Sequence, residues 1–84
     1  MTKLIYFAWV RERIGKREEE LDLPSEIETV ADLLGWLRAK GDGYGEALRQ
    51  PQVIRVAINE EHVAHSEKVF GAREIALFPP MTGG

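Results

Sequence analysis

The chain has 84 residues, a formal net charge of −3 at pH 7, no cysteine and two histidines. This length allows one small domain, and the absence of cysteine excludes a disulfide framework, a thiolate metal site and a cysteine nucleophile. The mild acidity offers nothing that attracts nucleic acid or anionic lipid, and no apolar run approaches the ~20 residues of a membrane span.

The N-terminal third predicts a β-hairpin. Lys3–Val10 is rich in aromatic and β-branched residues and predicts a first strand that is apolar on both faces. One face would carry Leu4, Tyr6, Ala8 and Val10, and the other Ile5, Phe7 and Trp9. Gly15-Lys16 predicts a turn, and Arg17–Leu23 predicts a second, more polar strand. Strand alternation divides the acidic run of this strand between its two faces, and charge on an edge strand opposes aggregation.

Thr29–Lys40 predicts the main helix. Thr29 suits the N-cap position with Asp32 three residues later, and Gly41 is placed to end the helix. Four apolar residues recur at helical spacing, namely Val30, Leu33, Leu34 and Leu37. Because glycine inside a helix costs about 1 kcal/mol relative to alanine, Gly35 predicts close packing against the sheet.

The segment after this helix predicts a loop at Asp42–Tyr44 and a short helical turn at Gly45–Gln50, ended by Pro51. Val53–Asn59 then predicts a third strand with one inward face, made by Ile54, Val56 and Ile58. Asn59–Glu61 predicts a turn into a short fourth strand around His62–His65.

Glu67–Phe70 predicts a brief turn, and Arg73–Phe78 predicts a fifth strand with Ile75 and Leu77 inward. The resulting order predicts an α+β protein with a mixed sheet of about five strands and one main helix packed on one face. This is the ubiquitin-like β-grasp arrangement, although the order alone leaves ferredoxin-like variants open.

Side chains suited to catalysis are few. His62 and His65 stand three apart in a predicted strand and would point to opposite faces, so we expect no metal site. Arg11 fits either an anchor for a partner or a solvated turn. No serine–histidine–aspartate set and no phosphate-binding glycine loop occurs, so we expect no active site in the domain itself.

The C-terminus is chemically distinctive. Pro79-Pro80 stops the last strand, and Met81, Thr82, Gly83 and Gly84 follow without a charged side chain. We therefore divide the chain into a domain of residues 1–80 and a flexible di-glycine tail of residues 81–84. A terminal glycine carboxylate becomes reactive when ATP adenylates it, and glycine has no Cβ to hinder attack.

Three segments resemble those of a known family: the N-terminal KLIYFAWVRERIG, the central VAIN and the C-terminal EIALFPPMTGG. The family that they resemble is the molybdopterin synthase small subunit family, the MoaD sulfur carriers. The resemblance covers essentially the whole chain, and FPP-x-TGG is its most specific part. It implies a ubiquitin-like β-grasp fold. It also implies that Gly84 is adenylated, converted to a thiocarboxylate, and donates sulfur to cyclic pyranopterin monophosphate in molybdenum cofactor biosynthesis.

The same resemblance implies the partners. These are the large synthase subunit, which holds the catalytic residues in a heterotetramer of two small and two large subunits, and an ATP-dependent adenylating and sulfurating enzyme. No cofactor is expected to bind the chain itself, and its expected compartment is the cytoplasm. We assign the tail function to Gly84, Gly83, Thr82 and Met81, and partner binding to Phe7, Phe78, Pro79, Pro80, Arg11 and His62.

Two positions depart from the family pattern. Gly71-Ala72-Arg73-Glu74 replaces an acidic turn before the last strand, and His62 stands where an apolar contact residue is common. Three alternatives stay open: a sulfur carrier of thiamine biosynthesis, a ubiquitin-like protein modifier, and a binding domain whose tail is inert.

Overall fold

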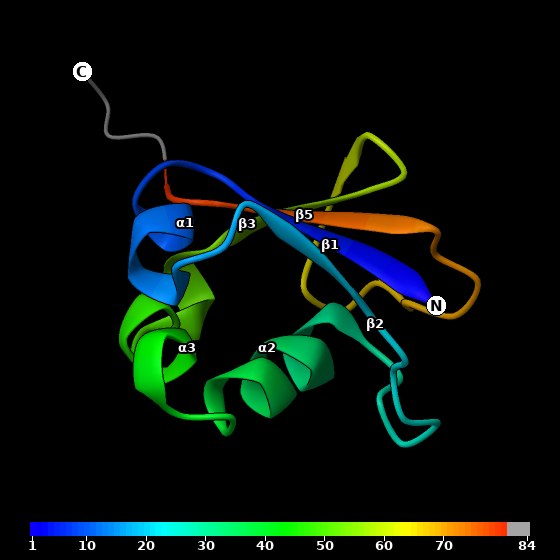
Figure 1. Cartoon of the computed structure of the whole chain (residues 1–84). Helices are drawn as coiled ribbons and strands as arrows, with labels where there is room; N and C mark the ends of the chain where they lie inside the picture. The colour runs from blue at the N-terminus through cyan, green and yellow to red at the C-terminus, as the bar shows by residue number, and fades with distance from the viewer. Residues whose placement is uncertain (81–84) are drawn as a thin grey trace.

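The computed structural model describes residues 1–80, so the predictions for Met81–Gly84 lie outside the described residues. One five-stranded sheet carries all of its helices on one side (Figure 1). The elements in chain order are β1 (Thr2–Tyr6), α1 (Ala8–Ile14), β2 (Glu18–Leu21), α2 (Val30–Arg38), α3 (Asp42–Ala47), η1 (Pro51–Val53), β3 (Arg55–Ile58), β4 (Glu61–Val63) and β5 (Glu74–Phe78).

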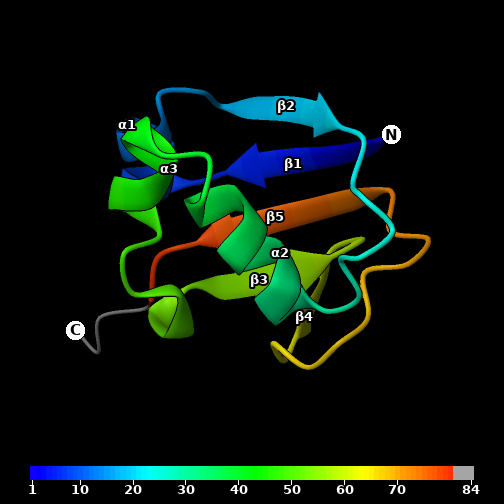
Figure 2. The same ribbon diagram turned by 90° about the horizontal axis from the view of Figure 1, so that it is seen from below.

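The sheet has the strand order β2-β1-β5-β3-β4. β1 and β5 are parallel, with Leu4 opposite Ile75 and Tyr6 opposite Leu77, and the other pairs are antiparallel. Figure 2 shows α2 crossing the sheet while α1 and α3 lie together at one end. The predicted mixed sheet of the β-grasp type is therefore confirmed. An α-helix that the sequence did not predict, α1, follows the first strand, and α3 overlaps the predicted short helical turn. No helix within residues 1–80 is long and apolar enough to cross a bilayer.

The predicted main helix is confirmed as α2, two residues shorter at its C-terminal end. The Thr29 side chain accepts a hydrogen bond from the Asp32 N–H at 3.2 Å, and the Asp32 carboxylate accepts one from the Thr29 N–H at 3.2 Å. This capping box fixes the start of the helix. Its four apolar residues are all at most 1% exposed, and burying each contributes roughly 1.5–3 kcal/mol.

The prediction that the first strand continues to Val10 is wrong. β1 ends at Tyr6, and Ala8–Ile14 forms α1, so a helix occupies the connection of the predicted hairpin. Val10 and Ile14 are one helical turn apart and are both buried in the core. Packing of these two side chains outweighs the strand propensity of the aromatic and β-branched run.

Two predictions in the next connection are also wrong. Asp42–Tyr44 is not a loop but the first half of α3, and Pro51 begins η1 instead of ending a helix. Proline suits the first position of a helix, because its missing N–H has no intrahelical partner there. The third strand starts at Arg55, two residues later than predicted, because Val53 belongs to η1.

The predicted turn between the third and fourth strands is confirmed. Asn59 and Glu60 have positive φ angles of 49° and 73°, which a two-residue type I′ turn between antiparallel strands requires. The Asn59 side-chain oxygen also accepts hydrogen bonds from the N–H groups of Arg73 and Glu74, both at 3.1 Å. The turn therefore also holds the start of β5 in place.

Close packing involves a different glycine from the one predicted. A Cβ at Gly35 would meet nothing within 4 Å, so the predicted contact with the sheet is absent. A Cβ at Gly43 would lie 2.9 Å from the Ile14 Cα and overlap the Arg13 carbonyl oxygen. Gly43 therefore allows α3 to approach the backbone of α1.

A polar cluster fastens the same helix to the sheet. The Glu19 carboxylate accepts hydrogen bonds from the hydroxyls of Tyr6 at 2.7 Å and Tyr44 at 2.6 Å. It also accepts one from the Lys16 ammonium at 3.0 Å. Glu19 thus links β1, β2 and α3, whereas Glu18 and Glu20 of the same acidic run are exposed.

The protonation of this cluster is fixed by its contacts. Burial opposes ionisation of Glu19, but the hydroxyls of Tyr44 and Tyr6 and the Lys16 ammonium outweigh it and lower the pKa of this carboxyl. Hydrogen bonds to Tyr44 and Glu19 raise the pKa of Lys16 to about 12. Burial, with the hydrogen bond to Glu19, raises the pKa of Tyr6. At neutral pH a carboxylate therefore faces an ammonium and two neutral hydroxyls.

The two glycines form a matched pair for a stability experiment. Gly35→Ala should raise the free energy of unfolding by up to ~1 kcal/mol, since alanine favours the helix and meets no neighbour. Gly43→Ala should lower it by roughly 1–3 kcal/mol, since backbone atoms must move. Urea unfolding of both variants measures the difference, and equal effects would contradict the close approach of α3 to α1.

Glu19→Gln should lower the free energy of unfolding by about 2 kcal/mol at pH 7, because hydrogen bonds to a charged acceptor are lost. The pKa of Glu19 is lower in the folded state, so its stabilisation is present above the unfolded pKa of about 4.5 and disappears as the pH falls below it. Urea unfolding between pH 3 and 7, at intervals of about one unit, should therefore show a weaker acid dependence in the variant.

Glu18→Gln is the matched control on the same strand. Glu18 pairs with Lys3 at 3.4 Å, and both side chains are about half exposed, so its loss should cost little. A Glu18 variant as unstable as the Glu19 variant would show that net charge, and not the polar cluster, sets the stability.

Candidate functional site

The candidate site lies where β1 and β5 end. Because these strands are parallel, the residue after β1, Phe7, reaches the same end of the sheet as the last residue of β5, Phe78. The Phe7 N–H donates a hydrogen bond to the Leu77 carbonyl at 3.1 Å, which continues the pairing of the two strands. Pro79 and Pro80 follow immediately and lead to the tail.

Three aromatic side chains gather at this point, and we call Phe7, Phe78 and His62 the aromatic stack. The rings of Phe7 and Phe78 are parallel within 2°, with centroids 4.7 Å apart. The His62 ring lies 5.6 Å from the Phe78 ring at 25°. Phe7 is 40% exposed, so part of this apolar surface is open to solvent.

The stack faces away from the helices. Ile75 and Leu77 are buried on the helix side of β5, as predicted, and Phe78 lies on the opposite face. Figure 1 shows that no helix covers this face of the sheet. The stack therefore belongs to the open face of the fold.

A hollow of about 440 Å³, the aromatic hollow, adjoins the stack. Its lining residues are Phe7, Ala8, Arg55, His62, Phe78, Pro79 and Pro80. Five of the six predicted partner-binding residues thus lie together, and the sixth, Arg11, does not line this hollow. Arg11 is exposed on α1, and its backbone N–H donates a hydrogen bond to the Phe7 carbonyl oxygen at 3.4 Å.

Sequence reasoning missed Ala8 and Arg55. Arg55 stands directly opposite Phe78 in the β3–β5 pairing, so its position follows from a register that the sequence did not supply. Ala8 has a φ of 53°, a conformation that alanine adopts at a cost of roughly 1–2 kcal/mol. The chain bends there from the open face toward α1.

The two histidines have separate surroundings. His65 Nε2 lies 2.7 Å from the Ile54 carbonyl oxygen, while His62 joins the aromatic stack. Within residues 1–80, no three histidine, aspartate or glutamate side chains are grouped as metal ligands. Chemically, the described site offers apolar and aromatic contact surface around the base of the tail, together with one guanidinium.

Comparison with known proteins places residues 4–84 in the ThiS family. The chain is 31% identical to the molybdopterin synthase sulfur carrier subunit of Escherichia coli strain K12, and the match covers all of both proteins. It is 34% identical to the protein of the same name from Haemophilus influenzae, again over both full lengths. Among solved structures, small archaeal modifier protein 1 of Haloferax volcanii has a TM-score of 0.70 at 29% identity, over 95% of this chain and 97% of that one.

Proposed function

This chain belongs to the ThiS family, and on that basis we propose that it is the sulfur-carrier subunit of a molybdopterin synthase, bearing its sulfur on Gly84. Its full-length similarity to two proteins of that name supports the proposal. The single observation that carries it is the position of the aromatic stack. The stack lies at the base of the sequence Pro-Pro-Met-Thr-Gly-Gly, where a partner must bind to reach the tail.

The chemistry resides in the terminal carboxyl group. An oxygen of the Gly84 carboxylate attacks the α-phosphate of ATP and displaces pyrophosphate, which forms an acyl adenylate. A sulfur nucleophile then attacks the acyl carbon, and AMP departs with the bonding electrons. With hydrosulfide as that nucleophile, loss of its proton leaves Gly84 as a thiocarboxylate. The chain has no cysteine, so this is the only place where it can hold transferable sulfur.

The body of the domain supplies binding. Exposed aromatic side chains contribute strongly to protein interfaces when a partner covers them, and Phe7 and Phe78 form such a surface. Pro79 and Pro80 limit the conformations of the chain between this surface and the tail. We propose that the adenylating enzyme and the large synthase subunit both bind this surface, and that ATP binds the former.

Sulfur transfer completes the proposed reaction. The thiocarboxylate enters the large subunit, which contributes the catalytic residues, and its sulfur passes to cyclic pyranopterin monophosphate. The thiocarboxylate sulfur attacks a side-chain carbon of the pyranopterin and displaces the oxygen substituent of that carbon, which departs with the bonding electrons. Water then cleaves the acyl–sulfur bond and returns the Gly84 carboxylate. Two such transfers supply the two sulfurs of the dithiolene. The assembly we propose contains two small and two large subunits.

A protein modifier is the second candidate. The structural similarity to small archaeal modifier protein 1 supports it, because both proteins share the fold over nearly their whole length. Activation of the terminal glycine would be the same in both cases. The difference lies in the acceptor, which is a lysine amine for a modifier and the pyranopterin precursor for a sulfur carrier.

Production of the chain with its activating enzyme, ATP and a sulfide source should exchange one oxygen of Gly84 for sulfur. Intact-mass measurement detects this exchange, and fragmentation of the protein ions locates it. Removal of Gly84 should abolish the exchange and leave the unfolding midpoint unchanged, because the described hydrophobic core is built from residues within 1–80. An unchanged mass with an activating enzyme that is active on another carrier would refute the proposed function.

The product formed from the activated chain distinguishes the candidate functions. The thiocarboxylate form, mixed with the large synthase subunit and cyclic pyranopterin monophosphate, should yield molybdopterin. Formation of a thiazole with thiamine-pathway enzymes would support the thiamine alternative instead. Isopeptide-linked products in cells would support the modifier.

Phe78→Ala should weaken binding to the activating enzyme roughly 30-fold, a loss of about 2 kcal/mol that is typical of an aromatic side chain central to an interface. Phe70→Ala is the matched control, because Phe70 is 98% exposed and lines a hollow with Met1 at the opposite end of the sheet. Isothermal titration calorimetry measures both affinities. Equal losses in the two variants would contradict binding through the aromatic stack.

A further inference from the structure

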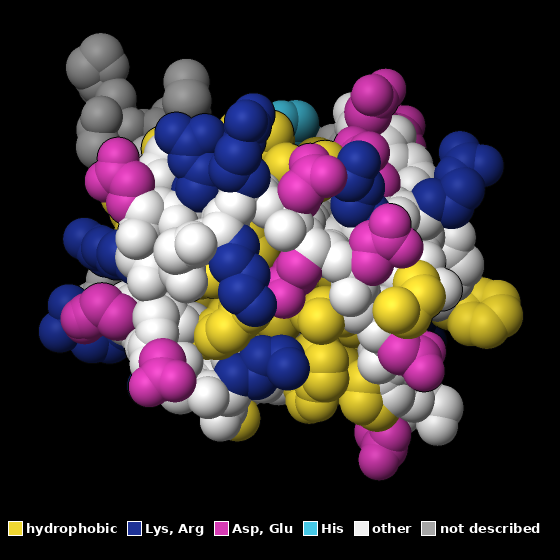
Figure 3. Space-filling model, viewed as in Figure 1, with side chains coloured by type: hydrophobic (Ala, Val, Ile, Leu, Met, Phe, Trp, Pro, Cys, Tyr) yellow, Lys and Arg dark blue, Asp and Glu magenta, His cyan; other side chains and the backbone are white. Residues whose placement is uncertain are grey.

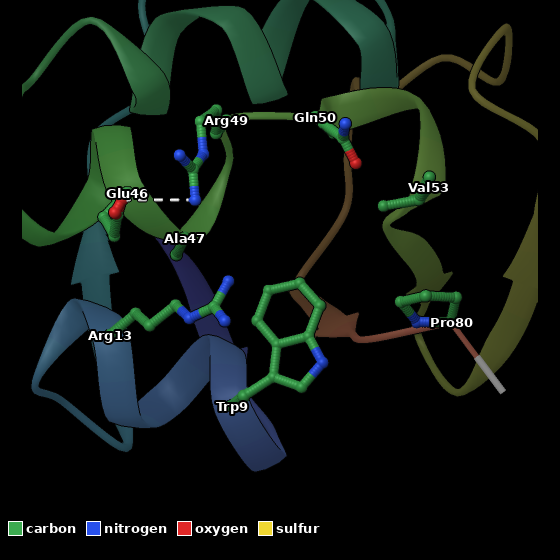
Figure 4. A pocket seen from close by; sticks show the side chains of 8 residues that line it. All are labelled: Trp9, Arg13, Glu46, Ala47, Arg49, Gln50, Val53 and Pro80. Atoms are coloured by element: carbon green, nitrogen blue, oxygen red, sulfur yellow. Dashed lines mark ion pairs between the residues drawn. The ribbon is translucent and has the colours of Figure 1, made fainter. Parts of the chain in front are cut away.

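A second hollow adjoins the base of the tail on the helix side, and we call it the Trp9 hollow. It has a volume of about 410 Å³ and lies between α1, α3 and η1. Its lining residues are Trp9, Arg13, Glu46, Ala47, Arg49, Gln50, Val53 and Pro80. Figure 4 shows Trp9 and Arg13 extending from α1 beneath Arg49, with Val53 and Pro80 on the opposite side.

Apolar surface is exposed in this hollow as well as in the aromatic stack. Val53 is 37% exposed, and Trp9 is partly exposed. Among the large hydrophobic residues of the described part, only Val53, Phe7, Met1 and Phe70 are strongly exposed. The first two line hollows at the base of the tail, and the other two lie at the far end.

Basic side chains surround the base of the tail although the whole chain is acidic. Three hollows share Pro80, and the charged residues that line them are Arg13, Arg49, Arg55 and a single acid, Glu46. Glu46 pairs with Arg49 at 3.6 Å, the contact drawn in Figure 4. Within residues 1–80, no carboxylate lies within ion-pair distance of Arg13 or Arg55.

Arg13 is held in position by an aromatic contact. Its guanidinium carbon lies 4.2 Å from the centroid of the Trp9 ring. A guanidinium that stacks on a ring keeps its N–H donors at its edge, where they can bind a carboxylate. Figure 3 shows basic side chains close together, with acidic ones beside them, toward the end of the molecule where β5 finishes.

The length of the tail determines what must contact this hollow. Four residues separate Pro80 from the end of the chain, and they span at most ~13–14 Å when fully extended. An enzyme that encloses the Gly84 carboxyl group must therefore bring its surface against the domain around Pro80. Pro80 borders both the aromatic hollow and the Trp9 hollow, so such a surface meets both.

We propose that the Trp9 hollow is a second docking site, which takes an acidic segment at the rim of the tail channel of the activating enzyme. An apolar side chain of that segment packs on Trp9 and Val53, and its carboxylates pair with Arg13 and Arg49. This inference rests on the proposed function, because it requires an enzyme that takes up the tail. It adds to the aromatic stack a basic site that guides the approach of the partner.

Charge reversal tests the electrostatic part of the proposal. The double variant Arg13→Glu with Arg49→Glu should bind the activating enzyme about tenfold more weakly at low salt, mainly through a slower association rate. The difference should shrink at high salt, because screening weakens exposed charge pairs. Surface plasmon resonance at low and high sodium chloride gives both rates. The control is Lys68→Glu with Arg73→Glu, which makes the same change in net charge at the opposite end.

Trp9→Ala tests the apolar part. It should bind about tenfold more weakly at both salt concentrations, through faster dissociation, since packing is insensitive to screening. Urea unfolding checks that each variant is folded. If a glutamate variant is unstable, Arg13→Gln with Arg49→Gln replaces it and should show a smaller loss of the same kind.

Three outcomes would overturn the proposal. In the first, the Arg13/Arg49 and Trp9 variants bind the activating enzyme as tightly as the unmodified chain, while Phe78→Ala binds more weakly. This result would refute the second docking site and leave the proposed function intact. The Lys68/Arg73 control could lose as much affinity as the Arg13/Arg49 variant, which would indicate net charge alone. Failure of the unmodified chain to release pyrophosphate with the activating enzyme and ATP would refute the proposed function, and the docking site with it.

Discussion

The parallel pairing of β1 with β5 is the constraint on which the rest of the structure depends. It places the first and last strands side by side in the centre of the sheet, so that both finish at the same end. Phe7 and Phe78 can stack only because of this pairing. The same pairing puts the bend at Ala8, and therefore the start of α1, beside Pro79 and Pro80. An antiparallel pair would have placed Phe7 at the opposite end of the sheet from Phe78 and the tail.

The two faces of the sheet differ in what covers them. On the helix side, α2 covers the core, and α1 and α3 pack together at the end near the tail, held by the close approach at Gly43 and the hydrogen bonds of Glu19. The open face keeps its aromatic side chains available. The Trp9 hollow lies on the helix side but shares Pro80 with the open face. The base of the tail therefore lies where the packed helix side of the sheet meets the exposed aromatic surface.

Elements with a strong local pattern could be predicted from the sequence, and elements that depend on contacts could not. The spacing of Thr29 and Asp32 predicts the start of α2, and the alternation of Ile75 and Leu77 predicts the inward face of β5. In α1 the decisive contacts are those of Val10 and Ile14 with the core, which a window of aromatic and β-branched residues conceals. Arg55 reaches the aromatic hollow through strand register, and the different surroundings of Gly35 and Gly43 exist only in three dimensions.

The strand polarity also separates the two chain ends. Met1 lines a hollow with Phe70 at the start of β1, whereas Pro80 lies beyond the other end of β5 (Figure 1). An affinity tag, fluorophore or surface linker attached at Met1 would therefore stand clear of both hollows and leave the terminal carboxyl group free. Any extension at the other terminus would replace that carboxyl group with a peptide bond. Under the proposed function, the choice of labelling site therefore decides whether the group that would carry the sulfur is present.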